Sequence, residues 1–172
     1  MSAQGGILAL DLSTHVGVAW GARGDAAPRT VVWNLPSCGL DIGRTFAAFE
    51  NELLDAFTLH KPSLVVMEAP LPPQGQTHAL TMRLQIGLAA ITACNCYRWE
   101  LPPPKEIPAS TARAGVLGSA RFPKGKIKET ITAWVRGHGI RVADHNAADA
   151  VVLWLHETGY RTPRQIQGRK AA

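Results

Sequence analysis

The chain has 172 residues and a net charge of +5 at pH 7, with 46% hydrophobic and 18% charged residues. These proportions are typical of a folded globular domain and exclude an intrinsically disordered chain. No apolar run is long enough to span a membrane, and the excess of positive charge favours a polyanionic partner.

Three apolar runs open the chain and predict strands at about residues 7–12, 16–21 and 30–35. The connections between them are short, so we expect the strands to pair antiparallel as a meander. Asp11 interrupts the first run and no basic segment precedes it, so we expect no signal peptide.

The hydrophobic pattern changes to a helical period at Asp41, which is placed to cap a helix that continues to about Phe57. After Pro62, residues 63–70 predict another strand that, like the first, is buried on both faces. A helix between two strands allows them to run parallel, so we expect this strand to lie beside the first strand of the chain.

A long apolar helix is expected at about residues 78–97, with these residues facing inward: Leu80, Leu84, Leu88, Ala90 and Ile91. Cys94 and Cys96 fall in the same stretch and are expected to be buried. The three cysteines of the chain form no CxxC pair, which favours a reducing, cytoplasmic environment.

The last third of the chain predicts a short edge strand followed by helices. The strand is expected at residues 105–108, and the helices at about residues 111–117, 124–135 and 146–160. We expect residues 1–160 to form a single domain and residues 161–172 to form a basic tail.

Two of the predicted strands deliver an acid to the carboxyl end of the sheet, Asp11 on the first and Glu68 on the fourth. Open α/β sheets bind their ligands at that edge. Two carboxylates repel unless a cation lies between them, and a divalent cation with oxygen ligands satisfies both. Asp149 on the last helix adds a third acid. On its own it could belong to a helix cap with Asn146, but beside the other two acids we assign it to the site.

The order of these motifs resembles the RNase H-like nucleases, and in particular the RuvC-type Holliday-junction resolvases and their divergent phage and prophage relatives. The resemblance rests on Asp11 in LALDLSTHVGVA, Glu68 in LVVMEAP and Asp149 in HNAADAVVLWL, and it runs from about residue 7 to residue 156. It implies an α/β, RNase H-like fold with a central mixed five-stranded sheet, an antiparallel meander plus parallel strands, flanked by helices.

The resemblance also implies an activity. It is that of a metal-dependent endonuclease that resolves four-way DNA junctions by paired symmetric nicks, leaving 5′-phosphate and 3′-hydroxyl ends. Two Mg²⁺ ions per active site are implied, with Mn²⁺ as a substitute, and so is a homodimer whose candidate interface is the long helix at residues 78–97. Bacterial members usually carry an aspartate or a histidine where this chain has Asn146. We expect Asp144 to be the fourth carboxylate of the metal site, with a helix N-cap as its alternative role. Asn146 is the other candidate for completing the site, because its side chain offers a neutral oxygen to a metal.

Basic residues are concentrated between residues 98 and 141. The resemblance places Lys124 near the scissile phosphate, with Lys126 as its competitor. We expect DNA contacts from these two lysines and from Lys128, Arg113 and Arg121, and we expect His145 to lie at the surface.

Three alternative functions follow from the same residues. The chain could be an RNase H-like nuclease that acts on other branched DNA or on RNA–DNA hybrids, or a non-catalytic module that binds branched DNA. The motif at Asp11–Gly17 also resembles the phosphate loop of actin-like sugar kinases, but 172 residues cannot hold the two domains that those enzymes need.

Overall fold

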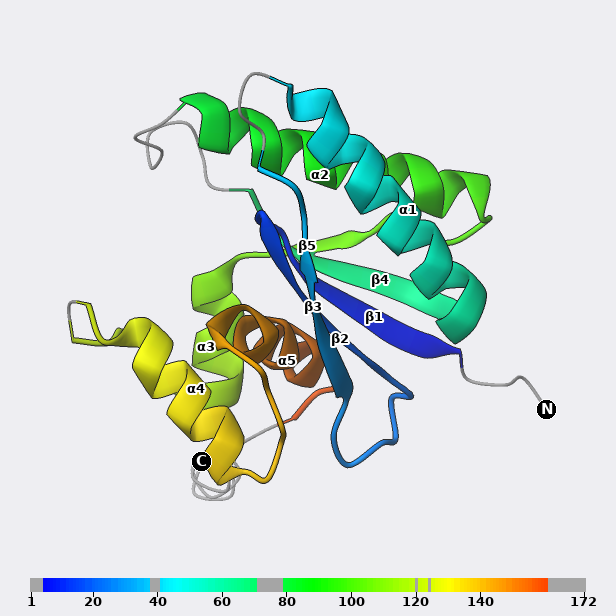
Figure 1. Cartoon of the computed structure of the whole chain (residues 1–172). Helices are drawn as coiled ribbons and strands as arrows, with labels where there is room; N and C mark the ends of the chain where they lie inside the picture. Colours follow the sequence, from blue (N-terminus) through cyan, green and yellow to red (C-terminus); the bar gives the residue numbers. More distant parts are fainter. Residues whose placement is uncertain (1–4, 38–40, 71–78, 120, 124, 161–172) are drawn as a thin grey trace.

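The structure is a computed structural model, and it describes residues 5–37, 41–70, 79–119, 121–123 and 125–160. A five-stranded sheet of order β3-β2-β1-β4-β5 lies at its centre (Figure 1). The strands are β1 (Gly6–Asp11), β2 (His15–Gly21), β3 (Arg29–Asn34), β4 (Pro62–Glu68) and β5 (Lys105–Ile107). The first three pair antiparallel, and β4 runs parallel to both β1 and β5. The predicted central five-stranded sheet, an antiparallel meander plus parallel strands, is therefore confirmed.

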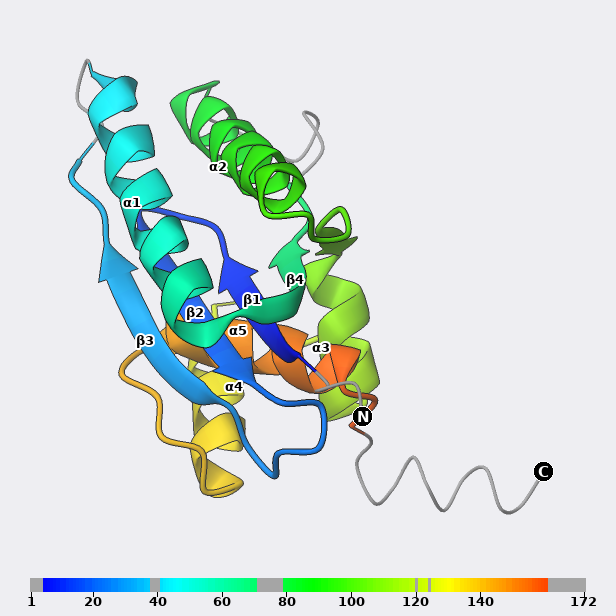
Figure 2. The same cartoon turned by 90° about the vertical axis from the view of Figure 1, so that its right-hand side faces the viewer.

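Helices cover both faces of the sheet and give three layers (Figures 1 and 2). One face carries α1 (Ile42–His60) and α2 (Ala79–Arg98), and the other carries α3 (Ala109–Leu117), α4 (Ile127–Gly137) and α5 (His145–Glu157). The predicted cap of α1 is confirmed, because the Asp41 side chain accepts a hydrogen bond from the backbone N–H of Arg44. Within the described part of the chain, no helix is long and apolar enough to cross a membrane.

Alternating side chains of β1 build two separate cores. Ile7 and Ala9 pack on the side of α3, α4 and α5, whereas Leu8 and Leu10 pack on the side of α1 and α2. All four side chains are almost inaccessible to solvent. A strand buried on both faces explains the continuous apolar run at the start of the chain, and it holds the following residue, Asp11, in a rigid position.

The α5 helix packs directly on β1 and β2. Its residues from Ala147 to Leu155 are all buried except Asp149, which is half-buried. Gly17 on β2 makes this packing possible, because a Cβ atom there would collide with the backbone carbonyl of Asn146. The beginning of α5 is therefore seated close to the sheet, at the end where β2 pairs with the last residues of β1.

The predicted inward face of α2 is partly wrong. The buried residues begin at Leu84, one turn after Leu80, whose side chain is 47% exposed. Ala90 and Cys94 are exposed as well, because each lies on the opposite side of the helix from a buried residue two positions earlier. Cys96 is buried as predicted. The helix therefore presents an uncovered apolar side to solvent.

Candidate active site

Two neighbouring parallel strands bring Asp11 and Glu68 together. Leu10 of β1 pairs with Met67 of β4, so the next residue of each strand is an acid at the same edge of the sheet. The two carboxyl groups are close enough that, in addition to burial, Glu68 raises the pKa of Asp11. The expectation that these two acids lie side by side is confirmed.

Asp149 completes the cluster from the buried face of α5. Burial, followed by the negative charges of Glu68 and Asp149, raises the pKa of Asp11 well above its usual range. The pKa of Glu68 is also raised, by burial and then by the charge of Asp149, and burial raises the pKa of Asp149. Three carboxyl groups thus share a site in which their combined ionisation is unfavourable, and such a site attracts a cation.

Arg113 of α3 provides one cation. Its Nη2 atom lies 3.3 Å from Oδ1 of Asp149, and both side chains are largely shielded, with 18% and 13% of their surface exposed. The positive charge of Arg113 partly offsets the rise in the pKa of all three acids. Sequence reasoning placed Arg113 among DNA contacts and missed its position inside the acid cluster.

Asp144 takes the second of its two predicted roles, that of a helix N-cap. It is the N-cap of α5, and its Oδ1 accepts a hydrogen bond of 2.9 Å from the backbone N–H of Ala147. Its Oδ2 accepts a bond of 3.1 Å from the side-chain amide of Asn146. Both carboxylate oxygens are therefore engaged at the helix start, and metal binding by Asp144 stays a prediction.

The acid cluster has the donor chemistry of a magnesium site. As the side chains stand, no three His, Cys, Asp or Glu residues of the described ranges converge closely enough to hold a metal ion. However, Asp11, Glu68 and Asp149 are all hard oxygen donors, which Mg²⁺ prefers. Burial raises the pKa of all three acids, and the charge of Arg113 offsets only part of that rise. The residues therefore fit a divalent cation.

The other predicted DNA contacts differ in what they touch. Lys126 pairs with Glu129 at 2.9 Å on the surface, and Lys128 Nζ lies 2.8 Å from Nε2 of His145. Arg121 is exposed in the segment before α4. Lys124 lies outside the described residues, and so does most of the loop that follows Glu68. His145 is partly exposed at the surface, where it is hydrogen-bonded to Lys128.

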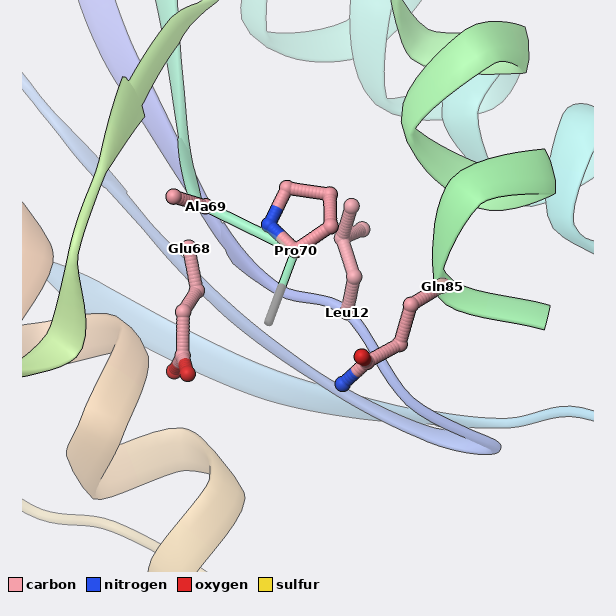
Figure 3. A pocket seen from close by; sticks show the side chains of 5 residues that line it. All are labelled: Leu12, Glu68, Ala69, Pro70 and Gln85. Atoms are coloured by element: carbon pink, nitrogen blue, oxygen red, sulfur yellow. The ribbon is translucent and has the colours of Figure 1, made fainter. Parts of the chain in front are cut away.

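A small hollow beside Glu68 contains a residue that sequence reasoning missed. It is lined by Leu12, Glu68, Ala69, Pro70 and Gln85, and Figure 3 shows the Gln85 side chain extending from α2 toward it. The hollow is large enough for roughly one water molecule. The sequence signal for Gln85 was an amide placed between two apolar residues, Leu84 and Ile86, in α2.

The sheet order, the two helical layers and the acids at the carboxyl end of β1 and β4 define an RNase H-like fold of the RuvC type. The structure is similar to that of RuvC from Thermus thermophilus, with a TM-score of 0.64 and 16% identity over 90% of this chain and 94% of that one. It is also similar to T. thermophilus RuvC in complex with a Holliday junction substrate, with a TM-score of 0.69 and 16% identity over 91% and 94%.

A third similar structure is the yeast mitochondrial Holliday junction resolvase Ydc2, with a TM-score of 0.63 and 14% identity over 98% of this chain and 82% of that one. No protein-family model matches the sequence, and neither does any curated protein. The RuvC-type resemblance is thus confirmed in the fold, over nearly the whole chain.

Proposed function

We propose that this protein is a metal-dependent endonuclease that resolves four-way DNA junctions. The observation that carries the proposal is the cluster of Asp11, Glu68 and Asp149 at the carboxyl end of β1 and β4. The cluster lies in a fold shared with two Holliday junction resolvases, one of which has been seen with its junction substrate.

In this proposal the three acids hold Mg²⁺, or Mn²⁺ in its place, with two ions per site as in other phosphodiesterases. Bound ions of this kind supply an activated water and stabilise the charge that develops on the leaving oxygen. The products would be 5′-phosphate and 3′-hydroxyl ends. The rigid ends of β1 and β4 hold two of the ligands, and the buried face of α5 holds the third.

Basic residues near the site would bind the backbone of the substrate. Arg113 pairs with Asp149, and a cation bound by Asp149 would release the guanidinium for a phosphate oxygen. We keep Lys124, Arg121, Lys126 and Lys128 as DNA contacts, because phosphate binding needs several exposed cations around a site.

Resolution of a junction needs two symmetric nicks, so we propose a homodimer with two-fold symmetry. The uncovered side of α2 is its candidate interface. Ile86 and Tyr97 are 52% and 85% exposed there, and Ala90 and Cys94 lie between them. Small and apolar residues on an exposed helix face suit close packing against a second copy. Light scattering should give the mass of a dimer, and Ile86→Glu should reduce it to that of a monomer.

A panel of end-labelled substrates tests the proposed function. It consists of a four-way junction, a flap, a plain duplex and an RNA–DNA hybrid, each incubated with Mg²⁺ or with EDTA. The proposal predicts cutting of the junction in Mg²⁺ only. Preferred cutting of the flap or the hybrid would support the broader nuclease alternative. Tight binding of the junction without any cutting would support the non-catalytic alternative.

A further inference from the structure

Two lysines at the beginning of α4 have different partners. Lys126, the residue before the helix, forms an exposed pair with Glu129, in which 62% and 71% of the side-chain surface is accessible. Lys128 lies in the first turn and points to another element, with its Nζ atom 2.8 Å from Nε2 of His145. The positive end of the helix dipole disfavours a cation in that turn, so the placement of Lys128 does not serve helix stability.

The contact between Lys128 and His145 places a cation beside the acid cluster. His145 is the first residue of α5 and lies one turn before Asp149, so the two side chains share a face of the helix. The charge of Lys128 is close enough to act on Asp149. Asp149 therefore has Arg113 from α3 as an ion-pair partner and Lys128 from α4 as a nearby charge.

The chemistry of the pair leaves Lys128 able to bind an anion. A lysine ammonium carries three N–H donors and no acceptor, so Nε2 of His145 accepts one hydrogen bond and its proton lies on Nδ1. Two donors of Lys128 remain, and its side chain is exposed. A free lysine side chain loses rotamer entropy when it is fixed, and the contact with His145 restricts it before any ligand binds.

We propose that Lys128 contacts a phosphate oxygen of the strand held at the acid cluster, and that His145 is the positioning residue that aims it there. This inference rests on the proposed function, because it takes the phosphodiester of a nucleic acid as the ligand of the site. It separates Lys128 from Lys126, whose ammonium is directed to Glu129 on the surface.

Five variants test the inference: Lys128→Ala, His145→Ala, the double variant, His145→Gln and Lys126→Ala as the matched control. Gln retains an acceptor near the place of Nε2, so it should restore what Ala removes. The measurements are the single-turnover cleavage rate at saturating protein, junction affinity in Ca²⁺ over a salt series, and thermal unfolding.

Lys128→Ala should lower the single-turnover rate roughly tenfold to a hundredfold, as expected for the loss of one donor to the reacting phosphate. His145→Ala should also lower the single-turnover rate, and the double variant should be no slower than Lys128→Ala. His145→Gln should recover most of the rate, and Lys126→Ala should change affinity only. Unfolding temperatures should stay close to that of the wild type.

An undiminished rate in Lys128→Ala, or additive losses in the double variant, would overturn the inference while the proposed function stands. If the wild type binds the junction but cuts nothing, the proposed function fails. The junction affinities of the variants then test the inference. Equal losses of affinity in Lys128→Ala, His145→Ala and the double variant would then support it. Affinity losses of the two single variants that add up in the double variant would reject it.

Discussion

The guanidinium of Arg113 lies 3.3 Å from the carboxylate of Asp149, at the place where the proposed site needs a cation. The pair joins α3 to α5 and is largely shielded from solvent. Its charge lowers the cost of holding three acids together, so it stabilises the fold without metal. A divalent ion and Arg113 are therefore expected to compete for Asp149.

The first prediction concerns this competition. Arg113→Gln should lower the metal-free stability by about 1–3 kcal/mol, because a charged hydrogen-bond donor is lost from a shielded site. Mg²⁺ should then raise the unfolding temperature of the variant more than that of the wild type, since no guanidinium has to be displaced. Thermal unfolding in EDTA and in a Mg²⁺ series measures both effects.

The control for this prediction is Arg98→Gln, which removes an exposed pair with Glu50 on the other side of the sheet. It should leave the response to Mg²⁺ unchanged and alter stability by less than about 1 kcal/mol. Equal Mg²⁺ responses of Arg113→Gln and the wild type would contradict the competition.

The second prediction concerns the pH dependence of metal-free stability. The pKa of Asp11 is higher in the folded protein than in the unfolded chain, so its ionisation opposes folding. The loss of stability caused by ionised Asp11 is present at pH values above the raised pKa, and it disappears as the pH falls below the usual pKa of an aspartate. Asp11→Asn should therefore raise the free energy of unfolding near neutral pH, and the gain should vanish in acid. Urea unfolding between about pH 8 and pH 3 measures it.

Glu157 provides a comparison of opposite sign. Burial acts to raise its pKa, but hydrogen bonds from Lys105 and Arg23, both at 2.9 Å, together with their charges hold the pKa below its usual value. Glu157→Gln should therefore destabilise the protein near neutral pH. That loss should disappear as the pH falls through the lowered pKa. Parallel profiles for the two variants would refute the assigned directions.

The third prediction concerns the position of α5 on the sheet. Gly17→Ala places a methyl group against the backbone of Asn146 and should push the start of α5 away from β2. We expect a loss of about 1–3 kcal/mol in stability. Since a shift of about 1 Å can cost a hundredfold in rate, cleavage should fall well beyond what the loss of folded protein explains. Circular dichroism and cleavage assays on the same sample separate the two effects.

Gly24→Ala is the matched control, because a Cβ atom at Gly24 meets no atom within 4 Å. Wild-type activity of a folded Gly17→Ala variant would show that the position of α5 does not govern the site.

The sheet was predictable for two reasons. Strands β1, β2 and β4 carry continuous apolar runs, as expected for strands buried on both faces, and the connections between the first three strands are short. The adjacency of Asp11 and Glu68 followed from the parallel pairing of their strands. The partners of Arg113 and Lys128 were not predictable, since helix pattern alone does not specify which charged side chain faces which neighbour.

The two roles of Asp144 could not be separated in the sequence. A cap and a metal ligand use the same carboxylate, and only the exact start of α5 at His145 decides that its oxygens bond to Ala147 and Asn146. The prediction of the inward face of α2 was partly wrong for a related reason. A helix that is apolar on most sides gives no periodicity from which to choose its buried side.

The central claim is that Asp11, Glu68 and Asp149 form the catalytic centre of a junction-resolving nuclease, and mapping the cuts in a labelled four-way junction tests it most directly. In Mg²⁺ the wild type should give paired symmetric nicks that a ligase can seal, and EDTA should abolish them. Asp11→Asn, Glu68→Gln and Asp149→Asn should each bind the junction in Ca²⁺ but cut it at least about a hundredfold more slowly, as expected when a charge-bearing group is lost from the reacting centre. Near wild-type cutting by any of these variants, or intact junctions with the wild type in Mg²⁺, would contradict the claim.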